Sequence, residues 1–80
     1  MSKDRLQIDA KGLKCPMPVI KLQQAVRKAE RGTEISIACT DKGAEKDIGS
    51  WSRVNKHHLL SVENMDYGLL ITIKVNGLES

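Results

Sequence analysis

The chain has 80 residues, a net charge of +3 and 40% hydrophobic residues. A chain of this length buries only about 60% of the surface that its unfolded form exposes, which allows one small core and predicts a single domain over residues 1–80. Two cysteines are too few for the disulfide framework of a small secreted protein, and no segment approaches the about 20 apolar residues that span a bilayer. We therefore expect an unprocessed cytoplasmic protein that is monomeric in isolation and does not insert into membranes.

Residues 5–9 alternate polar and apolar side chains, which predicts a half-buried strand that ends at Lys11-Gly12. In residues 18–30 the apolar side chains recur at helical spacing, which predicts an amphipathic helix that stops at Gly32. Proline suits the first turn of a helix but favours an extended conformation in the residue before it. The first helical residue is therefore left open between Pro16 and Pro18. The apolar face of this helix comprises Val19, Leu22, Val26 and Ala29.

In residues 34–40 the alternation returns, with Ile35, Ile37 and Cys39 on one face, which predicts a second strand. Asp41 is expected to cap a second helix, because its carboxylate can accept the N–H groups of the first turn. Acidic residues soon after Asp41 also favour a helix start here. The apolar stripe of that helix is predicted to contain Ala44, Ile48, Trp51 and Val54.

Residues 57–63 and 69–75 predict two further strands, which are joined as a hairpin through residues 64–68. Both predicted helices need an apolar surface to cover, and one face of a four-stranded sheet supplies it. The sequence therefore predicts an α+β fold, a two-layer α/β sandwich with the order β-α-β-α-β-β. Its mixed sheet of four strands has both helices on one face.

The motif with the clearest chemistry is Lys14-Cys15-Pro16-Met17-Pro18, between the first strand and the first helix. A thiolate at a helix entrance is favoured by the helix dipole and by free N–H groups, and Lys11 and Lys14 add positive charge. These effects are expected to lower the pKa of the Cys15 thiol from its usual value of about 8.5 and to make it a nucleophile. The same environment would stabilise a persulfide anion. Because no Cys-x-x-Cys is present, transfer by a single thiol is favoured over dithiol oxidation.

The segment from Leu6 to Pro18, which reads LQIDAKGLKCPMP, resembles the D-x-x-G-x-x-C-P-x-P opening of the TusA/SirA sulfur-carrier family. The resemblance covers nearly the whole chain, since it continues through Thr40-Asp41, Asp47-Ile48 with Trp51, and His58-Leu59-Leu60. It implies the two-layer fold and a persulfide carried on Cys15, with no other cofactor. In that case Cys15 is the reactive residue of a carrier, and not of an enzyme that turns over a substrate.

The resemblance also implies partners. A cysteine desulfurase or a rhodanese-type protein would supply sulfur to Cys15, and an acceptor similar to DsrE or TusBCD would receive it. The pathway is left open among tRNA thiolation, cofactor biosynthesis and oxidation of sulfur compounds. Many relatives have proline after the aspartate, whereas Lys42 follows Asp41 here, and this difference bears on the choice of partner. The other motif and surface residues expected to serve partner binding are Lys14, Pro16, Met17, Pro18 and Lys46.

Cys39 and Asp41 each have a plain structural interpretation. Cys39 continues the apolar face of the second strand and is predicted to be a core residue. Parallel strands covered by one helix end at the same edge of a sheet, however, so a disulfide or a sulfur relay between Cys39 and Cys15 is left open. Asp41 is more simply a helix cap than a participant in the chemistry.

Two other functions compete with sulfur carriage. A redox or regulatory protein-binding module would keep its function without the Cys15 thiol. Nucleic-acid binding would suit the basic charge, but with Trp51 and Tyr67 as the only aromatic residues and no run of lysines or arginines, stable binding is not expected. A metal site is not predicted either, because His57 and His58 would point to opposite faces of a strand and lack a third ligand. We expect both histidines on the surface.

Overall fold

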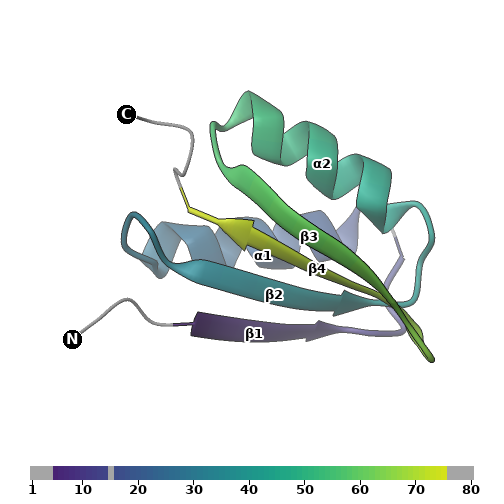
Figure 1. Cartoon of the computed structure of the whole chain (residues 1–80). Helices are drawn as coiled ribbons and strands as arrows, with labels where there is room; N and C mark the ends of the chain where they lie inside the picture. Colours follow the sequence, from purple (N-terminus) through teal and green to yellow (C-terminus); the bar gives the residue numbers. More distant parts are fainter. Residues whose placement is uncertain (1–4, 15, 76–80) are drawn as a thin grey trace.

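The computed structural model describes residues 5–14 and 16–75, and it shows the predicted order of elements (Figure 1). The described strands form a four-stranded sheet in the order β1-β2-β4-β3. β1 and β2 are parallel, whereas the other neighbours are antiparallel, which confirms the predicted mixed sheet. The elements are β1 Arg5–Ala10, α1 Met17–Lys28, β2 Glu34–Cys39, α2 Ala44–Val54, β3 His58–Met65 and β4 Gly68–Lys74.

The core is a layer of aliphatic side chains between the sheet and the helices. Ile35 and Ile37 of β2 lie opposite Ile73 and Ile71 of β4, and all four are fully buried. α1 lies against β1 and β2, and α2 lies against β3 and β4. Each fully buried isoleucine stabilises the fold by about 1.5–3 kcal/mol relative to an exposed one. The central strands therefore form a rigid base for the loops that leave their ends.

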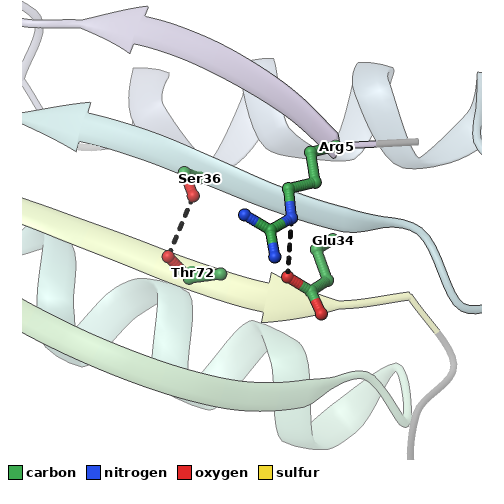
Figure 2. A network of polar contacts seen from close by, with 4 residues as sticks. All are labelled: Arg5, Glu34, Ser36 and Thr72. Atoms are coloured by element: carbon green, nitrogen blue, oxygen red, sulfur yellow. Dashed lines mark hydrogen bonds and ion pairs between the residues drawn. The ribbon is translucent and has the colours of Figure 1, made fainter. Parts of the chain in front are cut away.

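The opposite face of the sheet carries polar side chains. Ser36 and Thr72 lie directly opposite each other on β2 and β4, and their hydroxyl oxygens are hydrogen-bonded at 2.9 Å (Figure 2). Arg5 of β1 lies opposite Glu34 of β2, with 3.6 Å between Arg5 Nε and Glu34 Oε1. Because Arg5 is 83% exposed, this ion pair contributes at most about 1 kcal/mol. This face is the polar side of a sheet that is apolar on its other side.

The first helix begins between the two prolines. Pro16 is the N-cap residue, Met17 is the first helical residue, and Pro18 lies in the first turn. The helix start that the sequence left open between Pro16 and Pro18 is thus Met17, which is helical although the residue before a proline is usually extended. The first turn tolerates this arrangement, because the N–H that Pro18 lacks would have had no partner within the helix.

Two turns differ from the sequence prediction. α1 ends before Gly32, which has a φ of 92° and belongs to a turn closed by the Thr33 N–H and the carbonyl of Glu30, at 3.0 Å. Gly32 is thus a turn residue and not the helix stop. The hairpin is also tighter than predicted, since only Asp66-Tyr67 separates the two strands. A two-residue connection of this kind fits the right-handed twist of adjacent antiparallel strands.

The buried stripe of α2 continues to Ser52 and not to Val54. Ala44 and Ile48 are fully buried as predicted, and Ser52, four residues further on, is 1% exposed. Val54 is 78% exposed, so its assignment to the stripe is wrong. Side chains four residues apart share a helix face, and the stripe follows this spacing from Ala44 onward even though it meets a polar residue.

His57 is buried, although the sequence predicted it on the surface. It is 5% exposed, and its ring centroid lies 4.9 Å from that of the half-buried Trp51. The His57 N–H donates to the carbonyl of Ser52 at 2.8 Å, which folds the chain back against the end of α2 before β3 begins. Burial lowers the pKa of His57 from 6.5. His58 is exposed, as predicted.

Candidate functional site

The loop that leads to the cysteine motif begins at the end of β1 and is closely hydrogen-bonded. The Leu13 N–H donates to the carbonyl of Ala10 at 3.1 Å, and Gly12 between them has a φ of 84°, a conformation that glycine adopts without strain. The Lys11 N–H donates to Asp9 Oδ1 at 3.0 Å. Leu13 is partly buried against the core. The four residues before Cys15 therefore have a defined backbone.

Cys15 lies outside the described residues, but the residues on both sides of it are described. The Met17 N–H donates to the carbonyl of Lys14 at 2.8 Å, and the Ile20 N–H donates to the carbonyl of Pro16 at 3.1 Å. Lys14, Pro16 and Met17 are exposed, whereas Pro18 is buried. Pro18 therefore serves the geometry of the helix start and does not offer a surface to a partner.

The electrostatic character of this helix start differs in part from the prediction. Pro16 and Pro18 have no N–H, and the N–H of Met17 is bonded to Lys14. Fewer amide groups can therefore face an anion at the entrance of α1 than the motif alone suggests. The first turn has no acidic residue, and the positive end of the helix dipole remains. Together with the exposed Lys14, these features favour a negative charge at the helix start.

The loop between β2 and α2 lies beside the motif loop. Ala10 and Cys39 are partners at the ends of the parallel strands, so both loops leave the same edge of the sheet, as predicted. Beyond the strands, the Gly12 N–H donates to Thr40 Oγ1 at 2.8 Å and connects the two loops. Thr40 belongs to the segment that resembles the family, but this contact could not be predicted from the sequence, because it depends on how the two loops meet in the fold.

Asp41 shapes this second loop but is not the N-cap residue of α2. Its Oδ1 accepts the Gly43 N–H at 3.0 Å, and its carbonyl accepts the Ala44 N–H at 3.0 Å. Gly43 is the N-cap residue, and no side chain caps the helix there. The predicted cap is thus wrong by position, because the carboxylate acts within a turn that precedes the helix. Asp41 is half-buried at the edge of the sheet where the motif loop begins.

The basic residues predicted to meet a partner are exposed on different elements. Lys14 lies in the motif loop, Lys42 in the loop before α2, and Lys46 in the first turn of α2. Lys42 also lines a hollow of about 500 Å³ between its loop and the tip of the hairpin, where Tyr67 forms part of the wall. Lys11, which the sequence indicated only as a positive charge near the motif, has its Nζ 4.9 Å from the centre of the Tyr67 ring.

Cys39 is a buried thiol, as predicted for a core residue. It is fully buried in the apolar cluster and is not part of a disulfide. Burial, together with a smaller effect of the negative charge of Asp41, raises the pKa of the Cys39 thiol from 9.0 to about 11. Because the thiolate is the nucleophilic form, a thiol that stays protonated at neutral pH is poorly suited to sulfur transfer. Burial and a raised pKa therefore argue against Cys39 as a residue that transfers sulfur.

Within residues 5–14 and 16–75 the protein has neither a cluster of metal-ligating side chains nor a helix that could span a membrane. No three His, Cys, Asp or Glu side chains lie together so as to hold a metal ion in this part of the chain. None of the described helices is long and apolar enough to cross a bilayer.

Most of the chain is similar to a known protein family. It matches the model of the family described as Sulfurtransferase TusA over residues 6–75. A Bacillus subtilis (strain 168) protein named "Putative sulfur carrier protein YrkI" is 41% identical over 68 residues, which cover 85% of this chain and 87% of that protein. An Aquifex aeolicus (strain VF5) protein named "Putative sulfur carrier protein" is 38% identical over 72 residues, or 90% of this chain. The chain spans only 36% of that second relative.

A solved structure has the same architecture. The crystal structure of a SirA-like protein from Desulfitobacterium hafniense superposes with a TM-score of 0.76 and covers 90% of this chain and 97% of its own. The two sequences are 22% identical, so this likeness shows the fold alone. It agrees with the two-layer arrangement of four strands and two helices described above.

Proposed function

Because the chain belongs to the TusA/SirA family of sulfur carriers, we propose that Cys15 accepts a sulfane sulfur as a persulfide and passes it to an acceptor protein. The observation that carries the proposal is the sequence Cys15-Pro16-Met17-Pro18 at the start of α1, within a match that extends over residues 6–75. The exposed Lys14, the helix dipole and the absence of acid in the first turn support an anionic sulfur there.

The proposed chemistry is two thiol exchanges in sequence. The thiolate of Cys15 attacks the terminal sulfur of a donor persulfide, so a sulfur–sulfur bond forms on Cys15 while the donor bond breaks and the donor cysteine leaves as a thiolate. An acceptor thiolate then attacks the terminal sulfur on Cys15. The Cys15 thiolate is the leaving group and returns to its first state. One sulfur atom moves at each step, and no external oxidant or reductant is needed.

The donor is proposed to be a cysteine desulfurase or a rhodanese-type protein, and the acceptor a protein similar to DsrE or TusBCD. A carrier must present its sulfur to both partners, which agrees with the exposure of Met17 and of Lys14 beside the cysteine. Met17 is 42% exposed, and an unbranched, polarizable side chain of this kind adapts to partners of different shape. We further propose that the protein acts in the cytoplasm, where thiols remain reduced.

Intact-protein mass spectrometry tests the proposal. The chain is incubated with a cysteine desulfurase and cysteine, and separately with a low-molecular-weight persulfide. We expect the mass of one sulfur atom to be added to the wild type and to Cys39→Ala, but not to Cys15→Ser. Cys39→Ala is the matched control, because it removes the chain's other thiol. A wild type that stays unloaded with both donors, or a Cys15→Ser variant that loads equally well, contradicts sulfur carriage by Cys15.

A further inference from the structure

The two strands that bear the site loops end together, and one side chain extends their pairing. Backbone pairing of β1 with β2 ends at Ala10 and Cys39. One residue after Cys39, Thr40 Oγ1 accepts the N–H of Gly12 at 2.8 Å. A side-chain hydrogen bond therefore replaces the backbone ladder at the point where the chain turns toward Cys15.

Thr40 is itself held in place from two sides. The Asp41 carboxylate and carbonyl close the turn that follows it. On the other side lies Gly68, the first residue of β4, whose φ is 148°. A Cβ atom at Gly68 would collide with the carbonyl oxygen of Cys39 and would lie 3.0 Å from Thr40 Cα. The backbones of β4 and of Thr40 are thus in close contact, which makes Thr40 a fixed point for the loop that it contacts.

The loop that contains Gly12 also packs Leu13 against the core and places Lys11 beside the ring of Tyr67, but its other hydrogen bonds within the described residues are local. Its turn, closed by Leu13 and Ala10, and the bond from Lys11 to Asp9 are local. Local bonds fix the shape of the turn but do not fix its direction relative to the sheet. The bond from Gly12 to Thr40 joins residues 28 positions apart and attaches the backbone of the turn to the end of β2.

We propose that Thr40 is a positioning residue that holds the loop before Cys15 against the end of β2 and thereby sets the reactivity of the Cys15 thiol. This inference rests on the proposed function of Cys15. Without the hydroxyl of Thr40, Gly12 would donate to water, and the loop that leads to Lys14 would have a less defined position relative to the end of β2. The positive charge of Lys14 would then occupy several positions and would favour the Cys15 thiolate less.

The test compares Thr40→Val with Thr40→Ser and Thr72→Val. Thr40→Val replaces the hydroxyl by a methyl group of similar size, whereas Thr40→Ser keeps the hydroxyl. Thr72→Val is a matched control, because it removes a hydrogen bond of 2.9 Å to Ser36 on the polar face of the same sheet (Figure 2). Alkylation of Cys15 by iodoacetamide is followed from pH 5 to pH 10 in a Cys39→Ala background, and circular dichroism checks that each variant is folded.

We expect Thr40→Val to slow alkylation at neutral pH by about threefold to tenfold, the range that loss of one hydrogen bond implies. The pH midpoint of the reaction should rise. Thr40→Ser should react at nearly the rate of the parent, and so should Thr72→Val. A Thr40→Val variant that reacts as fast as its parent overturns the inference, and so does an equal slowing in Thr72→Val, which would indicate a general effect of stability.

A second measurement needs no variant. Hydrogen exchange of the Gly12 amide, followed by NMR in the wild type, should be slower than that of the exposed amides in the same loop. Exchange of Gly12 at the rate of an unstructured peptide overturns the inference even if Thr40→Val does not fold. Alkylation and hydrogen exchange use no sulfur donor. If the wild type fails to load sulfur, the proposed function is contradicted, but these two measurements still test the role of Thr40.

Discussion

The close contact between Gly68 and the loop before α2 leads to a quantitative prediction for Gly68→Ala. Gly68 has a φ of 148°, and its substitution places a Cβ against the carbonyl oxygen of Cys39 and the Cα of Thr40. Both are backbone atoms of the central strand or its end, so neither can rotate away as a flexible side chain would. The chain must either move β4 away from β2 or change the conformation of the hairpin.

The expected loss is the sum of two effects. A residue with a side chain in this backbone region costs about 1–3 kcal/mol. Overpacking a site that cannot yield costs about 1–3 kcal/mol more. We therefore expect Gly68→Ala to lower the free energy of unfolding by about 2–6 kcal/mol, when a domain of this length has only about 4–12 kcal/mol in total. Because the same contact supports Thr40, the variant should also load sulfur more slowly.

Two other glycines provide matched controls for this prediction. Gly12 has a φ of 84° but no heavy atom within 4 Å of an added Cβ, so Gly12→Ala should cost only the conformational strain of about 1–2 kcal/mol. Gly49 lies within α2, also in open space, and Gly49→Ala should stabilise the chain by about 0.5–1 kcal/mol. Urea denaturation followed by the fluorescence of Trp51 measures all three. A loss for Gly68→Ala no larger than that for Gly12→Ala refutes the reasoning.

Three further predictions follow from the titratable groups. The buried Cys39 thiol has a pKa of about 11 in the folded chain and of 9.0 in the unfolded chain, so the free energy of unfolding should fall as the pH rises from 9 to 11. Cys39→Val should abolish that fall in denaturation curves. Burial lowers the pKa of His57, so below pH 6.5 the unfolded chain gains a proton that the folded chain does not, and the free energy of unfolding falls as the pH falls. His57→Leu should therefore reduce this loss of stability in denaturation curves. If the loss is unchanged, groups other than His57 cause it. Lys14→Gln should slow alkylation of Cys15 by about twofold to threefold at low ionic strength, and equal rates at low and high salt would argue against an electrostatic role.

The sequence predicted the fold well because its strongest patterns concern the core. Ile35 and Ile37 alternate with polar residues, and their burial in β2 is a direct consequence of that period. The helices were found from their apolar spacing in the same way. The predicted burial was wrong at residues whose position in the fold, and not their local pattern, decides whether they are buried. Val54 fits the helical stripe but lies at the end of α2 and is exposed, whereas His57 is polar but packs against Trp51.

The site could be predicted only in part. Cys15 and its prolines form a contiguous motif, so the sequence identifies them without any knowledge of the fold. Thr40 and Gly68 cannot be found in this way, because their importance depends on the end of a parallel strand pair and on the close approach of β4. Asp41 was predicted to cap α2, but its carboxylate bonds one turn earlier, and that difference depends on the exact turn that precedes Ala44.

The most direct test of sulfur carriage by Cys15 is a two-step loading and release measurement. Wild-type protein is loaded by a cysteine desulfurase, freed of donor, trapped with an alkylating reagent and digested, and the added sulfur is located by tandem mass spectrometry. We predict that the sulfur is on the peptide that contains Cys15, and that it disappears when an acceptor thiol is added before trapping. Sulfur found on Cys39 instead, or sulfur that stays on Cys15 in the presence of acceptor thiols, would contradict this function.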